Sequence, residues 1–200
     1  AEVERGCADN LDEILACLQR NGPRRQFAPC WRREDFDPGT PQTRGLALED
    51  LYALRRGGEV VAVLGAWDQS SFKRTTIEGY SAPMRLARRL WNGLVTLRGY
   101  PPLPAVGETL RICYLSFLAI DDDDPDSFAT LVPAISADRA AAGDLLGAVG
   151  LHERDPLLPV ARRLSQFEYA GRLYTVCWED GEQALAELDG RVPFLEAALL

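Results

Sequence analysis

The sequence contains few of the residues that mark several large classes of protein. Lys73 is its only lysine and His152 its only histidine, and none of the five cysteines forms a CxxC pair. One histidine cannot build a histidine-rich metal site, so we predict no metal centre. No apolar run approaches the ~18 residues of a membrane-spanning helix, and the first ten residues are too polar for a signal peptide. We therefore expect a cytoplasmic protein with no transmembrane segment, most of whose cysteines are small buried hydrophobes.

The charge balance excludes a further class. The net charge is -8 at pH 7, and neutralisation of phosphates dominates the affinity of proteins for nucleic acids. We therefore expect no nucleic-acid partner. A length of 200 residues suits a single domain over 1–200, although Ala1 at the first position also fits a piece of a longer chain. The excess of arginine over lysine, with abundant alanine, leucine, glycine and aspartate, indicates GC-rich coding and a bacterial source.

Hydrophobic spacing predicts the helices and strands. Helices are predicted over 10–20, 83–97, from the aspartates at 121–124 to near Gly143, over 155–164 and over 182–188. Strands are predicted over 50–55, 59–67, 72–80, 110–120, 145–151, 167–169 and 172–178. Pro133 is expected to kink its helix or to mark a later start. The order of these elements, with two strand-helix-strand units, predicts an α/β (α+β) fold with a mixed, partly parallel sheet flanked by helices. A helical segment of about 72–107 is inserted into it.

One junction raises a question of charge. The predicted strand 110–120 runs directly into Asp121, Asp122, Asp123 and Asp124, and a helix follows. Glycine-rich junctions of this kind hold phosphates, because their backbone N–H groups approach the ligand closely. Here a phosphate ~4–6 Å from one carboxylate would be opposed by about 1 kcal/mol or more. Asp124 or Asp126 is predicted to cap the helix. The other acids form a solvated loop, a degenerate phosphate site, or a site that binds its ligand in an altered pose.

The order of elements, with the segments YLSFLAID, GEVVAVLGAWDQSSFKR and GLHERDPLL, resembles the GNAT (N-acetyltransferase-like) superfamily over roughly the whole chain. The resemblance implies a mixed, mostly antiparallel central sheet of six to seven strands flanked by helices. It also implies a central strand that parts from its neighbour and holds the pantetheine arm of acetyl-CoA or another acyl-CoA. The chain lacks the glycine-rich pyrophosphate loop of that family. Leu164 stands near the position of the tyrosine that often protonates the leaving thiolate in the family. The residues implied to bind the cofactor are Phe117, Leu118, Ala119, Ile120, Ser127 and Phe128.

Five further residues are candidates for the chemistry. His152 and Glu153 follow a predicted strand, where an imidazole tuned by a carboxylate can remove a proton from an amine. The alternative is a strand-end histidine bonded to a neighbouring group. Tyr80 is a candidate proton donor. Asp68 and Gln69 end another strand, where they either receive the acceptor amine or simply turn the chain.

The helix over 83–97 is amphipathic and basic. Its leucines form one stripe, and Arg85, Arg88 and Arg89 lie elsewhere on its surface. The arginines form either a solvated face or a docking surface for an acidic partner, such as an acyl carrier protein or an anionic membrane surface.

Three functional hypotheses follow from the resemblance and these residues. The first is an N-acyltransferase that moves an acyl group from a CoA thioester to a small-molecule amine. The second is a catalytically inactive domain of the same fold that serves as an interaction or regulatory module. The third is an acyltransferase that takes its acyl group from an acyl carrier protein.

Overall fold

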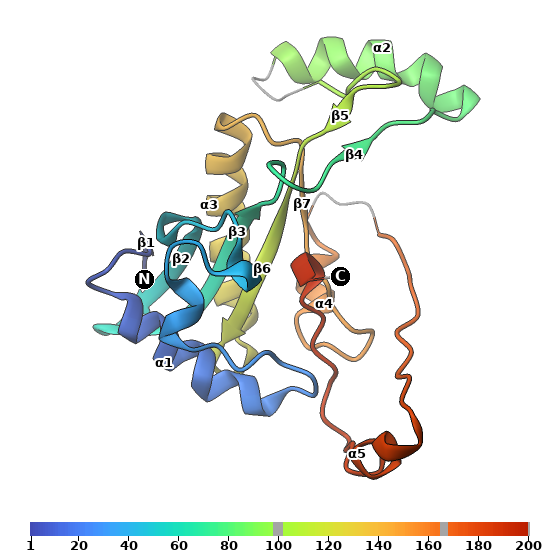
Figure 1. Ribbon diagram of the computed structural model, residues 1–200. Helices are drawn as coiled ribbons and strands as arrows, with labels where there is room; N and C mark the ends of the chain where they lie inside the picture. The colour runs from blue at the N-terminus through green and yellow to red at the C-terminus, as the bar shows by residue number, and fades with distance from the viewer. Residues whose placement is uncertain (98–101, 165–167, 200) are drawn as a thin grey trace.

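The computed structural model describes residues 1–97, 102–164 and 168–199 (Figure 1). Its central sheet has five strands in the order β1-β2-β3-β6-β7. They are β1 (Glu2–Arg5), β2 (Leu51–Arg56), β3 (Glu59–Asp68), β6 (Ile112–Ile120) and β7 (Leu146–Ala148). The first four strands pair antiparallel, and β7 pairs parallel to β6. The predicted mixed, mostly antiparallel sheet is confirmed, with five strands in place of six to seven.

A helix covers each face of the sheet, and a separate hydrophobic core lies between each helix and the sheet. On one face α1 (Leu11–Asn21) packs Ile14 and Leu18 against the sheet. On the other face α3 (Pro125–Ala141) packs Phe128, Leu131 and Ile135. Successive residues of a strand point to opposite faces, so the central strand β3 contributes side chains to both cores. The continuous apolar run in this strand is therefore buried on both sides.

The inserted segment forms a separate ribbon beside the sheet. Strands β4 (Thr75–Thr76) and β5 (Thr109–Leu110) pair antiparallel, and α2 (Ala82–Leu97) lies beyond them (Figure 1). The strand predicted over 72–80 is thus only two residues long. Among the described residues, no helix is both long and apolar enough to span a membrane.

The remaining elements are short. They are α4 (Leu158–Ala161), α5 (Glu182–Ala186) and the 3₁₀ turns Gly22–Arg24, Arg33–Phe36, Pro41–Thr43, Leu48–Asp50, Asp121–Asp123, Glu179–Gly181 and Ala197–Leu199.

Several expectations are corrected by the structure. Strand β1 was not predicted, because this edge strand has a single apolar residue. The helix predicted over 155–164 shrinks to α4, whereas α3 continues through Pro133, with large side chains buried on both sides of the proline. Over the described residues 168–178 there is neither helix nor strand, and the side chains of Tyr169, Tyr174 and Trp178 face solvent. Residue 167 of the predicted hairpin lies outside the described residues. Only two cysteines, Cys17 and Cys113, are buried.

Candidate functional site

Strand β6 pairs with β7 over only the first third of its length. The two strands pair from Ile112 to Tyr114, and within the described chain this pairing ends there, whereas β3 accompanies β6 to Ile120. The second half of β6 therefore presents one edge to a gap in the sheet. The implied pantetheine edge, Phe117 to Ile120, lies along this gap.

A bulge at Phe117 shapes the edge. Its φ of 57° lies in the left-handed region, and the register between β3 and β6 shifts here. Its ring is buried among aromatic rings, with centroid separations of 4.7 Å to Trp31 and 5.5 Å to Phe36. Gly65 on β3 makes room for this ring, because a Cβ atom at that position would lie 2.8 Å from Phe117 Cδ2. The bulge is thus held by packing on both sides.

The C-terminal segment 193–196 runs through the gap opposite β6. Leu195 forms an antiparallel bridge with Gly150, just beyond β7, and Pro193 forms a parallel bridge with Gln26, which follows α1. The Phe194 N–H donates to the Gln26 carbonyl at 2.7 Å. The gap is therefore a groove with β6 on one side and the C-terminal segment on the other.

Glu196 places a carboxylate against the exposed edge of β6. Its Oε2 accepts a hydrogen bond from the Phe117 N–H at 2.9 Å, and only 7% of the residue is exposed. Burial raises the pKa of this carboxyl group, and hydrogen bonds from Phe117, Ser116 and Ala198 offset part of that effect. The buried Glu196 carboxylate thus accepts from a backbone N–H of β6 that lies beyond the stretch paired with β7.

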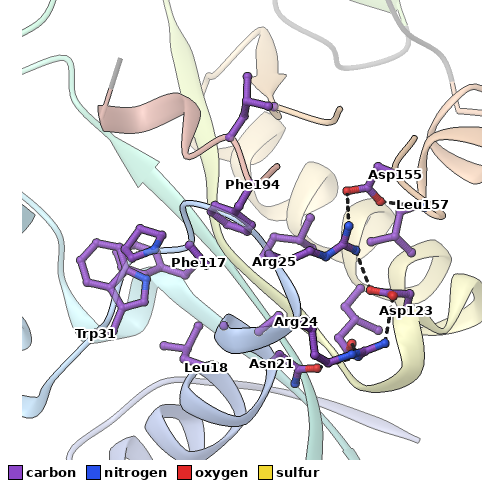
Figure 2. A pocket seen from close by; sticks show the side chains of 18 residues that line it. Leu18, Asn21, Arg24, Arg25, Trp31, Phe117, Asp123, Asp155, Leu157 and Phe194 are labelled. Atoms are coloured by element: carbon purple, nitrogen blue, oxygen red, sulfur yellow. Dashed lines mark hydrogen bonds and ion pairs between the residues drawn. The ribbon is translucent and has the colours of Figure 1, made fainter. Parts of the chain in front are cut away.

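Figure 2 shows the groove from close by, with the basic and acidic side chains at its mouth. Trp31, Phe117 and Phe194 form its inner wall, and Arg24, Arg25, Asp123 and Asp155 lie at the opening. The free space left inside is about 30 Å³, which is room for only a few water molecules. The groove is therefore narrow, with Phe194 and Leu195 of the C-terminal segment lining it.

The aspartates that follow β6 are paired with arginines that lie about a hundred residues earlier in the sequence. Asp121 accepts from Arg20 at 2.7 and 2.8 Å and from Asn21 at 2.8 Å. Burial alone would raise the pKa of Asp121, but the hydrogen bonds from Arg20 and Asn21 outweigh it and lower that pKa. The negative charge that was expected to oppose a phosphate here is therefore compensated in part by arginines within the chain.

Asp123 is held by two arginines at once. Arg24 reaches it at 2.9 Å and Arg25 at 2.6 Å, and Arg25 continues to Asp155 at 3.1 Å. Asp122 and Asp123 both have positive φ angles, which aspartate tolerates better than most residues, so the chain turns here without glycine. Arg24 also donates to the Ile120 carbonyl at 3.3 Å, at the end of the parted edge.

The N-terminus of α3 already has an acidic partner. The Asp124 carboxylate accepts from the Asp126 N–H at 3.2 Å and the Ser127 hydroxyl at 2.7 Å, and Arg56 lies 3.1 Å away. These contacts, the Ser127 hydrogen bond first, lower the pKa of Asp124. Ser127 is buried with its hydroxyl engaged, and the side chain of Phe128 packs in the core.

His152 and Glu153 lie outside the groove. Of the described residues, neither is among those that line it. The His152 Nδ1 accepts a hydrogen bond from the Arg154 N–H at 3.1 Å, and Glu153 is exposed. This geometry fits the alternative interpretation of a strand-end histidine bonded to its neighbour.

Of the described residues, Tyr80, Asp68 and Gln69 are also not among those that line the groove. The Tyr80 hydroxyl donates to the Pro104 carbonyl at 2.7 Å within the inserted segment. Asp68 pairs with Cys113 at the opposite end of β6. Gln69 is buried, donates to the Ala198 carbonyl at 2.9 Å, and leaves its Oε1 without a hydrogen bond.

Sequence patterns did not indicate the charged groups at the groove, which are Arg24 and Arg25 in its lining and Glu196 next to the lining residue Leu195. Glu196 stands in the apolar tail PFLEAALL, where one acid among large hydrophobes is the available signal. Arg24 and Arg25 stand in a turn-rich segment that offers no periodicity. Among the described residues, no cluster of histidine, cysteine or acidic side chains has the geometry to hold a metal ion.

Comparison with known proteins adds no assignment. No protein-family model matches the chain, and a search of curated proteins finds no match.

Proposed function

We propose that the chain is an N-acyltransferase of the GNAT type, which moves an acyl group from an acyl-CoA thioester to an amine in the groove beside β6. One observation carries the proposal. Phe117 lines the groove on the part of β6 that does not pair with β7, and its N–H donates to the buried carboxylate of Glu196 at 2.9 Å, next to the lining residue Leu195. The order of strands and the helices that cross between them support the same proposal.

The proposed reaction uses both groups. The thioester carbonyl oxygen takes the Phe117 N–H in place of Glu196, and this donor stabilises the negative charge that develops on the oxygen. The amine nitrogen attacks the carbonyl carbon, and the carbon–sulfur bond breaks to release the CoA thiolate, which solvent protonates. Glu196, displaced but adjacent, takes the proton from the attacking amine. Its raised pKa suits a base, because burial makes a carboxylate bind protons more strongly.

The mouth supplies the cations for a phosphorylated donor. Arg24 and Arg25 both contact Asp123 there, and Arg24 is 40% exposed. In the proposal the CoA pyrophosphate competes with Asp123 for these guanidinium groups, because guanidinium groups bind phosphate in a bidentate manner.

The pairing of acidic side chains with arginines and with a helix N-terminus inside the chain favours a second candidate function. Asp123 occupies Arg24 and Arg25, and Asp124 occupies the N-terminus of α3. A domain whose polar groups are satisfied in this way suits an interaction or regulatory module that binds no CoA.

Calorimetry and thermal shift with acetyl-CoA distinguish the two candidates. The enzyme proposal predicts binding and a rise in melting temperature, with CoA thiol release on addition of an amine panel. Absence of heat and of thermal shift at millimolar acetyl-CoA eliminates the acyl-CoA proposal and leaves the interaction module.

The role of Glu196 has a separate test. Glu196→Gln keeps an acceptor for the Phe117 N–H but cannot take a proton. We expect acetyl-CoA binding to persist and turnover to fall by about 10²–10⁴-fold, the usual contribution of a general base. Glu187→Gln, at an exposed site, is the matched control and should match the wild type.

A further inference from the structure

Helix α2 exposes its apolar face. Leu86, Leu90, Leu94 and Leu97 recur at helical spacing and are 57–86% exposed, and Trp91 beside them is half exposed. None of the sixteen described residues of α2 is buried. An amphipathic helix on a globular protein normally turns this face to the core. Here the face is left for something outside the chain.

The polar side of α2 is the side attached to the protein. Arg88 and Asn92 donate to the Leu103 carbonyl at 3.1 and 3.0 Å, and the Leu103 N–H donates back to Asn92 Oδ1 at 2.9 Å. Arg88 also lies over the ring of Tyr80 at 5.5 Å. The helix is therefore held by its polar side against the returning chain, and its leucines lie on the opposite side.

The charge of α2 is opposite to that of the whole chain. Its charged residues are Arg85, Arg88 and Arg89, and its sequence contains no aspartate or glutamate, although the chain carries a net charge of -8. Basic residues next to an anionic membrane surface each contribute about 1 kcal/mol to binding. This helix is thus the part of the protein that a negatively charged surface attracts.

We infer that α2 docks the protein on membranes that contain anionic phospholipid, with the leucine face in the interface and the arginines among the headgroups. The combination of an apolar face carrying leucine and tryptophan with an arginine-rich polar face is typical of helices that lie in the membrane plane. The leucine stripe runs about 16 Å along the helix, from 1.5 Å per residue. Because α2 lies outside the sheet, beyond the β4–β5 ribbon, a flat surface can reach it (Figure 1).

Flotation of the full chain with vesicles tests the inference. Vesicles of phosphatidylcholine alone are compared with vesicles that also contain phosphatidylglycerol. We expect binding to the anionic vesicles, at least about tenfold weaker binding to the neutral ones, and a loss of binding as salt is added. Leu90→Glu with Leu94→Glu should abolish binding while the circular dichroism spectrum stays unchanged. Arg85→Glu with Arg89→Glu should weaken it at least about tenfold.

The matched controls make the same changes elsewhere. Val176→Glu alters an exposed apolar residue outside α2, and Arg163→Glu with Arg172→Glu reverses two exposed arginines. Both should bind vesicles as the wild type does. Absence of binding to anionic vesicles, or binding that survives the two leucine substitutions, overturns the inference. Capture of an acidic carrier protein, or self-association, that depends on Leu90 and Leu94 without vesicle binding assigns the face to a protein partner and overturns it as well.

Discussion

At the scale of single residues, Glu196 links the stability of the fold to pH. Its hydrogen-bond partners, Phe117, Ser116 and Ala198, are uncharged, so its carboxylate is buried among neutral groups. Its pKa is higher in the folded than in the unfolded chain. The protonated form therefore favours folding, and this contribution is lost as pH rises through the folded pKa.

Glu196→Gln should remove this pH dependence. The amide resembles the protonated acid, keeps an acceptor for the Phe117 N–H and does not ionise. We expect the melting temperature of the variant to rise relative to the wild type as pH increases from about 4 to about 8, a range that begins near the ordinary glutamate pKa. Thermal melts across this range provide the measurement. A constant difference between the two proteins would show that Glu196 titrates normally.

Arg25 illustrates a different effect of burial on charge. It is 12% exposed and bridges Asp123 and Asp155, which are 21% and 8% exposed. Arg25→Met leaves the buried Asp155 without its cation, whereas Asp123 keeps Arg24, so we expect a loss of about 3 kcal/mol in the free energy of unfolding. Arg33→Met breaks an exposed pair with Asp12 and should cost less than about 1 kcal/mol. Urea unfolding of both variants gives the comparison, and equal losses would contradict the buried-charge explanation.

At the scale of elements, the bulge in β6 depends on a glycine in the neighbouring strand. An added Cβ atom at Gly65 would lie 2.8 Å from Phe117 Cδ2 and 3.2 Å from Leu51 Cδ2. Gly65→Ala should therefore destabilise the protein by about 1–3 kcal/mol, the usual cost of overpacking. Gly147→Ala in β7 is the control, because its nearest contact would be an ordinary 3.4 Å. Chemical denaturation measures both, and a neutral Gly65→Ala would show that Phe117 moves aside freely.

The same elements show what sequence patterns predict and what they miss. Helices α1 and α2 follow from their apolar spacing, and β3 follows from an apolar run that both cores require. The second half of β6 was located, but the partner facing it was not. Glu196 lies 79 residues from Phe117 along the chain, and local periodicity carries no information on such a contact. The prediction of a strand over 172–178 is wrong for a related reason, because apolar and aromatic residues favour a strand only where a neighbouring strand pairs with them.

At the scale of the whole molecule, the chain has two parts that differ in whether their helices are buried against a core. The five-stranded sheet and its helices bury two cores and carry the proposed acyl site. The ribbon with α2 buries none of its helix and carries the proposed membrane face. The two parts join through β4 and β5, where Ile77 and Glu108 meet in a backbone hydrogen bond of 3.0 Å. This narrow connection makes the second part removable.

Replacing residues 78–107 with Asn-Gly tests that division. Ile77 and Glu108 already face each other across the ribbon, so a two-residue turn can join them. Because none of the described residues of α2 is buried, we expect the melting temperature to stay within about 4 °C of the wild type, the shift that about 1 kcal/mol produces in a protein of this size. Acetyl-CoA binding should persist, and vesicle binding should disappear.

The same variant decides the role of Tyr80, which lies in the excised segment. If the tyrosine protonates the leaving thiolate, excision abolishes acyl transfer, and Tyr80→Phe in the full chain reduces it by a similar factor. The position of its hydroxyl, bound to Pro104 within the insertion, predicts the opposite result. We expect both variants to transfer acyl groups as the wild type does. Collapse of the excised protein into aggregates would contradict the independence of the two parts, because the insertion would then be needed for folding.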